Sequence, residues 1–180
     1  MTGSTALGEQ LDPESLRRVM ARYFDTAKRA VEHHGGTVEK FIGDAVMAVF
    51  GVPVVHEDDA LRAVRAAGEI QEALAELNEE IARDYGTTLQ ARIGVNTGEV
   101  VTGTEERLAT GDAVNVAGRL EQAARPGEVL LGEETLRLTR ASVKIEPVEP
   151  LSLKGKSAPV AAFRLLSVSR EGPSAASTSR

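Results

Sequence analysis

The sequence predicts an α+β fold, an α/β sandwich in which helices pack on a ferredoxin-like sheet. Helical and strand-like segments follow one another as helix, hairpin, helix, hairpin, helix, a split βαβ order that lacks its first strand. Two tight-turn signals, Gly43-Asp44 and Thr97-Gly98, each separate short apolar runs, as in β-hairpins. With 180 residues and 42% hydrophobic content, the chain is expected to form a single domain with one core.

The first half of the chain predicts two long helices around a hairpin. Asp12-Pro13 is typical of a helix start, because aspartate caps the first turn and proline suits it, and Gly35-Gly36 ends this helix. Residues 38–42 and 45–50 are apolar on both faces, which is expected of central strands covered by helices. Residues 56–82 open with acidic side chains and continue with helical apolar spacing, so they predict the second helix.

The second half predicts shorter elements. They are a hairpin at 89–96 and 99–102, a helix at 112–124, strands at 129–132, 143–146 and 159–166, and a short helix at 133–139. Serine, alanine, glycine and arginine dominate the last residues. We therefore expect the folded domain over 1–166 and a disordered tail over 167–180.

Composition excludes several classes of function. A net charge of −6 and 3% aromatic residues argue against a nucleic-acid-binding protein. No apolar run reaches the length of a membrane span and no signal peptide is evident, so a soluble, cytoplasmic protein is expected. The absence of cysteine excludes disulfides and thiolate chemistry. The three histidines lack the spacing of a zinc site.

Lys40 and Asp44 are candidate site residues at the first hairpin. Lys40 precedes the Gly43-Asp44 turn by three residues, so both side chains can face the same end of the hairpin. An aspartate at a turn tip can reach a magnesium ion, which prefers carboxylate, water and phosphate oxygens. The alternative is that Asp44 only suits the turn and that Lys40 is a solvated strand end.

Asn115 and Arg119 are four residues apart on a predicted helix, so their side chains emerge on one face. A guanidinium in such a position can stabilise the negative charge that builds on phosphate oxygens during phosphoryl chemistry. The alternative is an exposed arginine that pairs with Glu121 or Glu128, beside a solvated asparagine.

The segments EKFIGDAVMAVF and GDAVNVAGRLE resemble the class III nucleotidyl cyclases, and the resemblance covers about residues 3–166. It implies conversion of ATP or GTP into the 3′,5′-cyclic nucleotide and pyrophosphate, a phosphorus–oxygen lyase reaction of intracellular signalling that uses Mg²⁺ or Mn²⁺. It also implies a head-to-tail homodimer whose sites combine residues of both subunits. The alternative function is a non-catalytic cyclase-like module that dimerises or binds nucleotide.

The resemblance assigns a role to each candidate residue. Asp44 binds the metal and Lys40 recognises the purine. Asn115 orients the ribose, and Arg119 stabilises the transition state. Lys154, in LKGKSAPV, contacts the terminal phosphates, although a surface lysine beside a glycine turn is the alternative.

Three positions depart from the family pattern. In the family pattern the opening strand ends in F-x-D, which includes a second metal-binding aspartate. Gly3-Ser4-Thr5 matches the residues that follow this strand, so the strand would fall just before Met1. For the chain as written we therefore expect weak binding of metal-nucleotide and negligible cyclisation. Leu108 stands where many cyclases carry a polar residue that reads the purine, so we expect only a modest preference for ATP over GTP. Gly118 replaces the usual serine or alanine beside Arg119.

Overall fold

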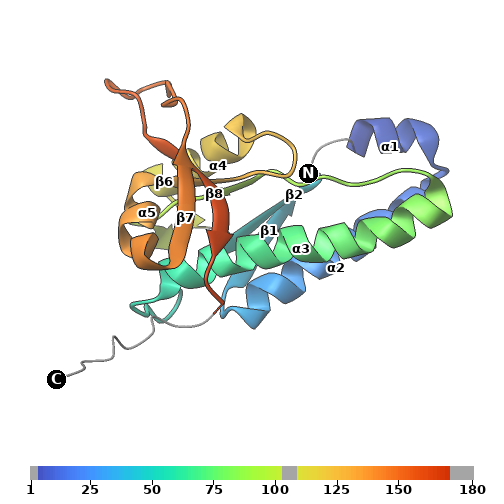
Figure 1. Cartoon of the computed structure of the whole chain (residues 1–180), viewed down its shortest axis with the longest axis horizontal. Helices are drawn as coiled ribbons and strands as arrows, with labels where there is room; N and C mark the ends of the chain where they lie inside the picture. The colour runs from blue at the N-terminus through green and yellow to red at the C-terminus, as the bar shows by residue number, and fades with distance from the viewer. Residues whose placement is uncertain (1–3, 103–108, 171–180) are drawn as a thin grey trace.

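The computed structural model describes residues 4–102 and 109–170, the side chains of 4–6 excepted (Figure 1). The helices are α1 Ser4–Gln10, α2 Pro13–His33, α3 Asp59–Tyr85, α4 Asp112–Ala123, α5 Glu133–Thr139 and the 3₁₀ helix η1 Arg140–Ser142. The strands are β1 Thr37–Ile42, β2 Ala45–Val49, β3 Ile93–Val95, β4 Val101–Thr102, β5 Ala109–Thr110, β6 Val129–Gly132, β7 Val143–Pro147 and β8 Ala162–Val168.

A four-stranded sheet in the order β3-β6-β8-β7 forms the middle layer, with β3 and β6 parallel and the other pairs antiparallel. Strand β6 is buried throughout. Its residues alternate between the two faces: Val129 and Leu131 pack with Val64 of α3, whereas Leu130 packs with Leu120 of α4. Helices α3 and α4 therefore cover opposite faces of the sheet, which confirms the predicted α+β sandwich.

The two long helices lie side by side (Figure 1). The predicted start of α2 is confirmed, because the carboxylate of Asp12 accepts hydrogen bonds from the backbone N–H groups of Glu14 and Ser15 at 3.1 and 3.0 Å. Buried side chains of α1 and of both long helices form a cluster with the chain entering β3: Leu7, Val19, Tyr23, Leu74, Leu77, Ile81, Leu89 and Ala91.

Asn78 of α3 fixes the entry into β3. Its amide donates to the carbonyl oxygen of Leu89 and accepts from the backbone N–H of the same residue, both at 2.7 Å. The side chain of Gln71 donates to the carbonyl oxygen of Ala91 at 3.0 Å. These bonds satisfy backbone groups just before β3, where Leu89 is fully buried.

The environment predicted for the first hairpin is wrong. The turn at Gly43-Asp44 is confirmed, since Ile42 pairs with Ala45. However, β1 and β2 form a two-stranded sheet of their own rather than central strands of the main sheet. Phe41 and Ile42 are 50% and 55% exposed. Apolar residues on both faces of a strand indicate that both faces can be buried. They do not indicate which part of the protein, or which subunit, buries them.

The second predicted hairpin is also wrong. Strand β3 pairs with β6, and β4 pairs with β5. Thr97 hydrogen-bonds Thr135 of α5 at 2.8 Å, and a Cβ at Gly98 would come within 2.8 Å of Ala113 in α4. Thr97-Gly98 therefore packs closely against two helices and does not form the tight turn of a hairpin.

Two further elements differ from the prediction. Helix α1 was not predicted. Strand β8 runs to Val168, so the folded part extends past the predicted limit at 166. Ser169 continues the contact, with its N–H donating to the carbonyl of Ser142 at 2.8 Å, and Arg170 pairs with Glu72 at 2.7 Å. The remainder of the predicted tail lies outside the described residues.

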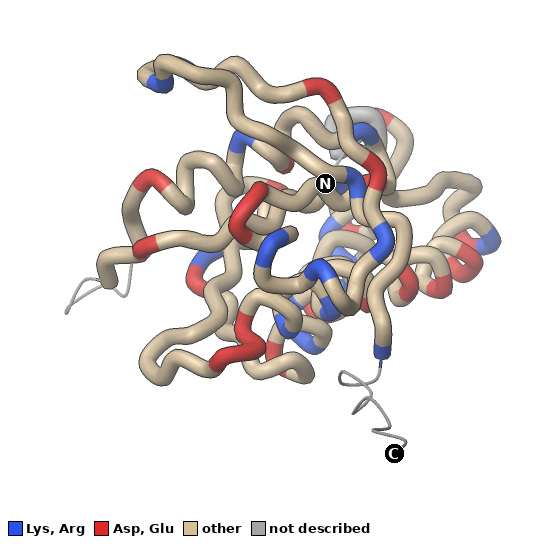
Figure 2. Tube along the Cα trace, turned by 60° about the vertical axis from the view of Figure 1, so that its left-hand side comes forward, with Lys and Arg blue, Asp and Glu red and all other residues tan. Residues whose placement is uncertain are grey.

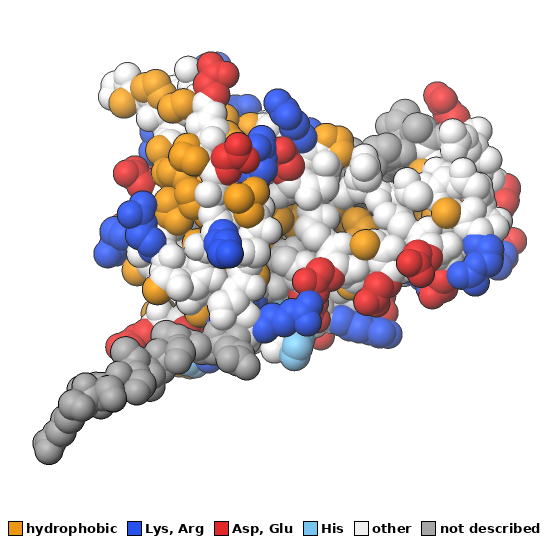
Figure 3. Space-filling view, in the orientation of Figure 1, with side chains coloured by type: hydrophobic (Ala, Val, Ile, Leu, Met, Phe, Trp, Pro, Cys, Tyr) orange, Lys and Arg blue, Asp and Glu red, His pale blue; other side chains and the backbone are white. Residues whose placement is uncertain are grey.

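Charges of both signs are spread over the traced chain, including the two long helices (Figure 2). Hydrophobic side chains gather instead over β7 and β8 and the connection between them (Figure 3, upper left). On β8, Leu166 is 59% exposed. No helix in the described ranges is both long enough and apolar enough to cross a membrane.

Candidate functional site: a hollow along α4

Helix α4 presents Asn115 and Arg119 on its exposed face. The helix begins at Asp112, directly after Gly111, whose φ of 137° favours glycine. Val116 and Leu120 are buried on the opposite face. The two polar residues therefore emerge together because the apolar ones are fixed against the sheet.

A hollow of about 560 Å³ runs along this face. On one side it is lined by α4, including Asn115 and Arg119, and on the other by the connection between β7 and β8, including Lys154. Three of the predicted site residues, Asn115, Arg119 and Lys154, thus line the same hollow, although Lys154 lies 39 positions after Asn115 in the sequence. An adjoining hollow of about 330 Å³ shares Arg119 and extends along residues 149–153.

The connection between β7 and β8 is held over α4 by specific contacts. Leu151 and Val160 exchange two backbone hydrogen bonds of 2.8 Å, which close its base. The Nζ of Lys156 lies 2.5 Å from a carboxylate oxygen of Asp112 at the start of α4. Lys156 was not singled out in the sequence, although it stands two residues from Lys154 in the same glycine turn.

The acidic partners considered for Arg119 are engaged elsewhere. Glu121 pairs with Arg92 at 3.4 Å, and Glu128 pairs with Arg164 at 2.7 Å. The guanidinium of Arg119 donates to the side-chain oxygen of Gln122 at 3.3 Å, a long bond to a neutral acceptor. A phosphate would be a much stronger acceptor, so this bond is readily exchanged for an anionic ligand.

Lys40 and Asp44 lie outside this hollow, both half-buried on the β1–β2 hairpin. A bulge in β1 sets Glu39 out of register, and its carboxylate accepts a hydrogen bond from the backbone N–H of Ala109. This contact joins β1, the strand that carries Lys40, to β5. Leu108 itself lies outside the described residues.

The pKa of Tyr23 is raised by burial and, in part, by the charge of Asp44 at the hairpin turn. Burial, and after it the negative charges of Asp44 and Glu121, raise the pKa of Tyr23 to about 12 from its ordinary 10.0. The hydroxyl is therefore protonated throughout the neutral range, and its ring packs tilted against Phe24 with centroids 5.5 Å apart.

This pKa predicts a loss of stability in strong alkali. The folded state favours the protonated Tyr23, so its contribution to the free energy of unfolding is complete below pH 10 and is lost as pH rises from 10 towards 12. In Tyr23→Phe the ring remains and the titration disappears. We expect the fall in urea stability between pH 10 and 12 to be shallower in this variant than in the wild type, after each is normalised to its value at pH 7. An identical fall would contradict the prediction.

Comparison with known proteins identifies the family. The family model for the adenylate and guanylate cyclase catalytic domain matches residues 1–166. The chain belongs to this cyclase family. The relatives named as cyclases include adenylate cyclase 1 of Rhizobium meliloti, 31% identical over 174 residues, and the adenylate cyclase of Anabaena cylindrica, 33% identical over 129 residues. These matches cover 92% and 66% of this chain but only 26% and 25% of the relatives, so the chain spans about a quarter of their length.

Solved structures confirm the cyclase fold. The adenylyl cyclase CyaB from P. aeruginosa superposes with a TM-score of 0.87 at 29% identity, over 94% of this chain and 91% of that one. The guanylyl cyclase Cya2 gives the same TM-score at 34% identity, over 94% and 89%. One of these is named for adenylyl and the other for guanylyl cyclisation, so the fold by itself leaves the base open.

The residues of the cyclase domain suit the metal that its family implies. Magnesium is commonly held by one or two carboxylates together with phosphate oxygens and water. Asp44 supplies one carboxylate at the tip of a turn, half-buried and close enough to act on Tyr23. Oxygen donors of this kind suit Mg²⁺ or Mn²⁺ rather than a softer ion.

Proposed function

We propose that this cyclase domain converts ATP or GTP into the 3′,5′-cyclic nucleotide and pyrophosphate for intracellular signalling in the cytoplasm. The observation that carries the proposal is the meeting of Asn115, Arg119 and Lys154 in one hollow. Its volume falls in the range of small-molecule sites. Its walls carry three cationic side chains, Arg119, Lys154 and Lys156, together with the amides of Asn115 and Gln122. Such groups suit a ligand with several phosphates and a polar sugar.

Each of these side chains has a distinct part in the reaction. Attack of the ribose 3′-hydroxyl on the α-phosphorus increases the negative charge on the phosphate oxygens, and the guanidinium of Arg119 stabilises that charge as it develops. Asn115, one helical turn away, holds the ribose so that the hydroxyl faces the phosphorus. Lys154 neutralises the terminal phosphates that leave as pyrophosphate.

Asp44 would hold Mg²⁺ or Mn²⁺, which when bound neutralises phosphate charge. Lys40 reads the purine from the neighbouring strand. Because leucine has no polar side-chain atom, Leu108 adds no hydrogen bond to the base, and we expect ATP to be favoured only modestly over GTP.

The two halves of the site come from different subunits of a head-to-tail homodimer. Lys40 and Asp44 do not line the hollow that holds Arg119. Phe41 and Ile42, on the same hairpin, are apolar and about half exposed, as expected of residues that a second copy covers. A two-fold axis would bring each hairpin to the hollow of the partner and create two equivalent sites.

Mixing two inactive variants tests this arrangement. Asp44→Ala and Arg119→Ala chains should each be nearly inactive. A heterodimer of the two retains one site with both residues intact, so an equimolar mixture should recover about a quarter of the wild-type activity if subunits pair at random. Cyclic nucleotide formation from Mn²⁺ and ATP is the measurement. Asp44→Ala mixed with the double variant Asp44→Ala/Arg119→Ala is the control, because no intact site can form in it.

The wild-type reference is assayed both as this chain and with an apolar strand that ends in F-x-D placed ahead of Met1, and the variants are made in the more active form. Mixtures that stay inactive although sedimentation shows dimers would place the whole site in one subunit. If both reference forms bind nucleotide without cyclising it, the non-catalytic regulatory module is the better description.

A further inference from the structure

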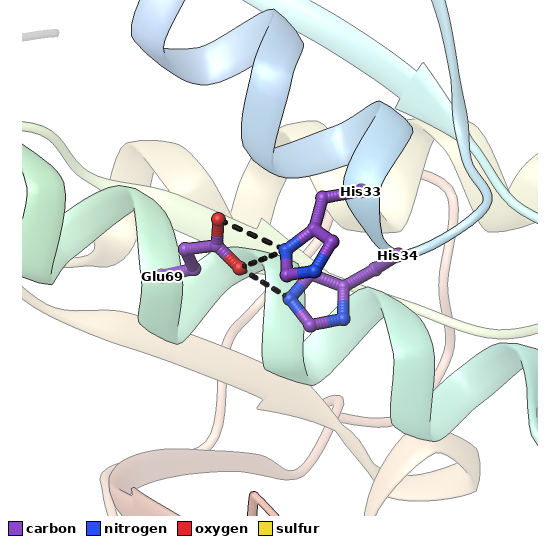
Figure 4. Close-up of side chains that lie close together, drawn as sticks. All are labelled: His33, His34 and Glu69. Carbon is purple, nitrogen blue, oxygen red and sulfur yellow. Dashed lines mark hydrogen bonds and ion pairs between the residues drawn. The ribbon is translucent and has the colours of Figure 1, made fainter.

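A cluster of side chains remote in sequence joins the end of α2 to the middle of α3 (Figure 4). His33 is the last residue of α2, His34 follows it as the cap, and Glu69 lies on α3. The Nδ1 atom of His33 lies 2.9 Å from Oε2 of Glu69, and the Nε2 atom of His34 lies 2.6 Å from the same oxygen. Both imidazoles therefore point at one carboxylate.

Within residues 4–102 and 109–170, this is the one group of at least three His, Cys, Asp or Glu side chains whose ligand atoms all lie within 4.8 Å of one another. Two imidazole nitrogens and a carboxylate oxygen form a donor set used by zinc and related ions. Tetrahedral zinc holds ligand atoms roughly 3.3 Å apart. The two nitrogen–oxygen spacings here are 2.9 and 2.6 Å, and all three ligand atoms lie within 4.8 Å of one another.

The backbone holds the histidines in place while their side chains keep an open side. The N–H of His34 donates to the carbonyl of Ala30 at 3.3 Å, and that of Gly36 donates to Val31 at 2.9 Å, so the turn after α2 is fixed. The side chain of His34 is 19% exposed, whereas that of His33 is 70% exposed. An ion can enter from the side of His33, and water can complete its coordination.

The carboxylate of Glu69 is held between the two imidazoles. A metal binds the deprotonated carboxylate and neutral imidazoles. Arg170, whose charge also acts on Glu69, makes its ion pair with Glu72, one turn further along α3, at 2.7 Å.

We propose that His33, His34 and Glu69 form a binding site for a divalent transition-metal ion of the zinc class, with water as the remaining ligand. This site is separate from the one proposed at Asp44, which lies in the turn between β1 and β2. The two sites also differ in the ion they select, because imidazole nitrogens favour zinc-like ions and carboxylate oxygens favour magnesium. It does not rest on the cyclase activity. A bound ion would join α2 to α3 just before β1, the strand that carries Lys40.

Zinc titration by calorimetry tests the proposal on the tag-free chain in buffer without chelators. We expect one ion per chain. His34→Ala and Glu69→Gln should each weaken binding by more than about 10-fold, since even outer partners of a metal site contribute 10- to 100-fold. Zinc should raise the melting temperature of the wild type but not that of Glu69→Gln. Cobalt, used as a visible probe, should give the strong absorption of a tetrahedral site in the wild type but not in His34→Ala or Glu69→Gln.

Two matched variants separate this site from other zinc-binding groups. His56→Ala removes a histidine that also lies beside a carboxylate, Asp59 at 3.4 Å, and should bind zinc like the wild type. Asp44→Asn should bind it equally well. The proposal fails if no saturable binding occurs, if Glu69→Gln and His34→Ala bind like the wild type, or if Asp44→Asn abolishes binding. Circular dichroism checks that each variant folds, and His33→Ala, at the most exposed ligand, provides a second test.

Discussion

Arg119→Ala is expected to lower the rate of cyclic nucleotide formation by about 100- to 1,000-fold, the effect of removing one preorganised donor from developing oxyanion charge. The side chain is exposed on α4 and makes one long hydrogen bond to Gln122, so its removal should leave the fold intact. Because the interaction strengthens in the transition state, kcat should fall while KM changes little. Steady-state kinetics with Mn²⁺ and ATP, on variants made in the more active of the two reference forms, measure both.

Arg125→Ala is the matched control. Arg125 is exposed just after α4 and lies outside both hollows, so its loss should leave the rate near that of the wild type. Arg119→Lys keeps a positive charge but loses the planar fork of donors, and we expect it to restore only part of the activity. A rate in Arg119→Ala within a few-fold of the wild type would exclude the transition-state role.

Gly94→Ala is expected to destabilise the protein by about 3 kcal/mol, a large effect for one methyl group. A Cβ at Gly94 would overlap the carbonyl oxygen of Ala117 and the backbone nitrogen of Glu121. These are backbone atoms of α4, so no side chain can rotate away. Strand β3 would have to move from the helix, with loss of the contact that positions Asn115 and Arg119. Urea denaturation followed by circular dichroism gives the difference in free energy.

Gly118→Ala is the control for the same chemical change on the helix itself. Nothing lies within 4 Å of a Cβ at Gly118 among the described atoms. Alanine favours helix over glycine by about 1 kcal/mol, so this substitution should stabilise the protein by up to that amount. The two glycines lie on contacting elements but should shift stability in opposite directions. If Gly94→Ala were neutral, β3 would not be pressed against α4 as the structure has it.

The helices and most of the strands could be predicted from the sequence because their signals are local. Asp12-Pro13 starts α2 through its own backbone geometry, and residues 133–139 and 129–132 form the helix and strand expected of them. The family was recognisable for the same reason, since Lys40 with Asp44 and Asn115 with Arg119 each stand within one short segment. The pairing of β3 was not predictable in this way. Its partner β6 lies more than 30 residues further on.

What the sequence alone determined is the family and most of the helices and strands, since each depends on neighbours along the chain, and it also supplied the candidate residues for the proposed chemistry. Only the tertiary structure decided that Lys154 faces Arg119 across a hollow, that the hairpin of Asp44 lies outside it, and that Glu69 receives both histidines. Those relations depend on long-range packing, chiefly the burial of β6 between α3 and α4 and the pairing of α2 with α3. The hydrophobic effect depends on the apolar area that is buried and not on which residues bury it, so no local pattern could specify which distant side chains come together.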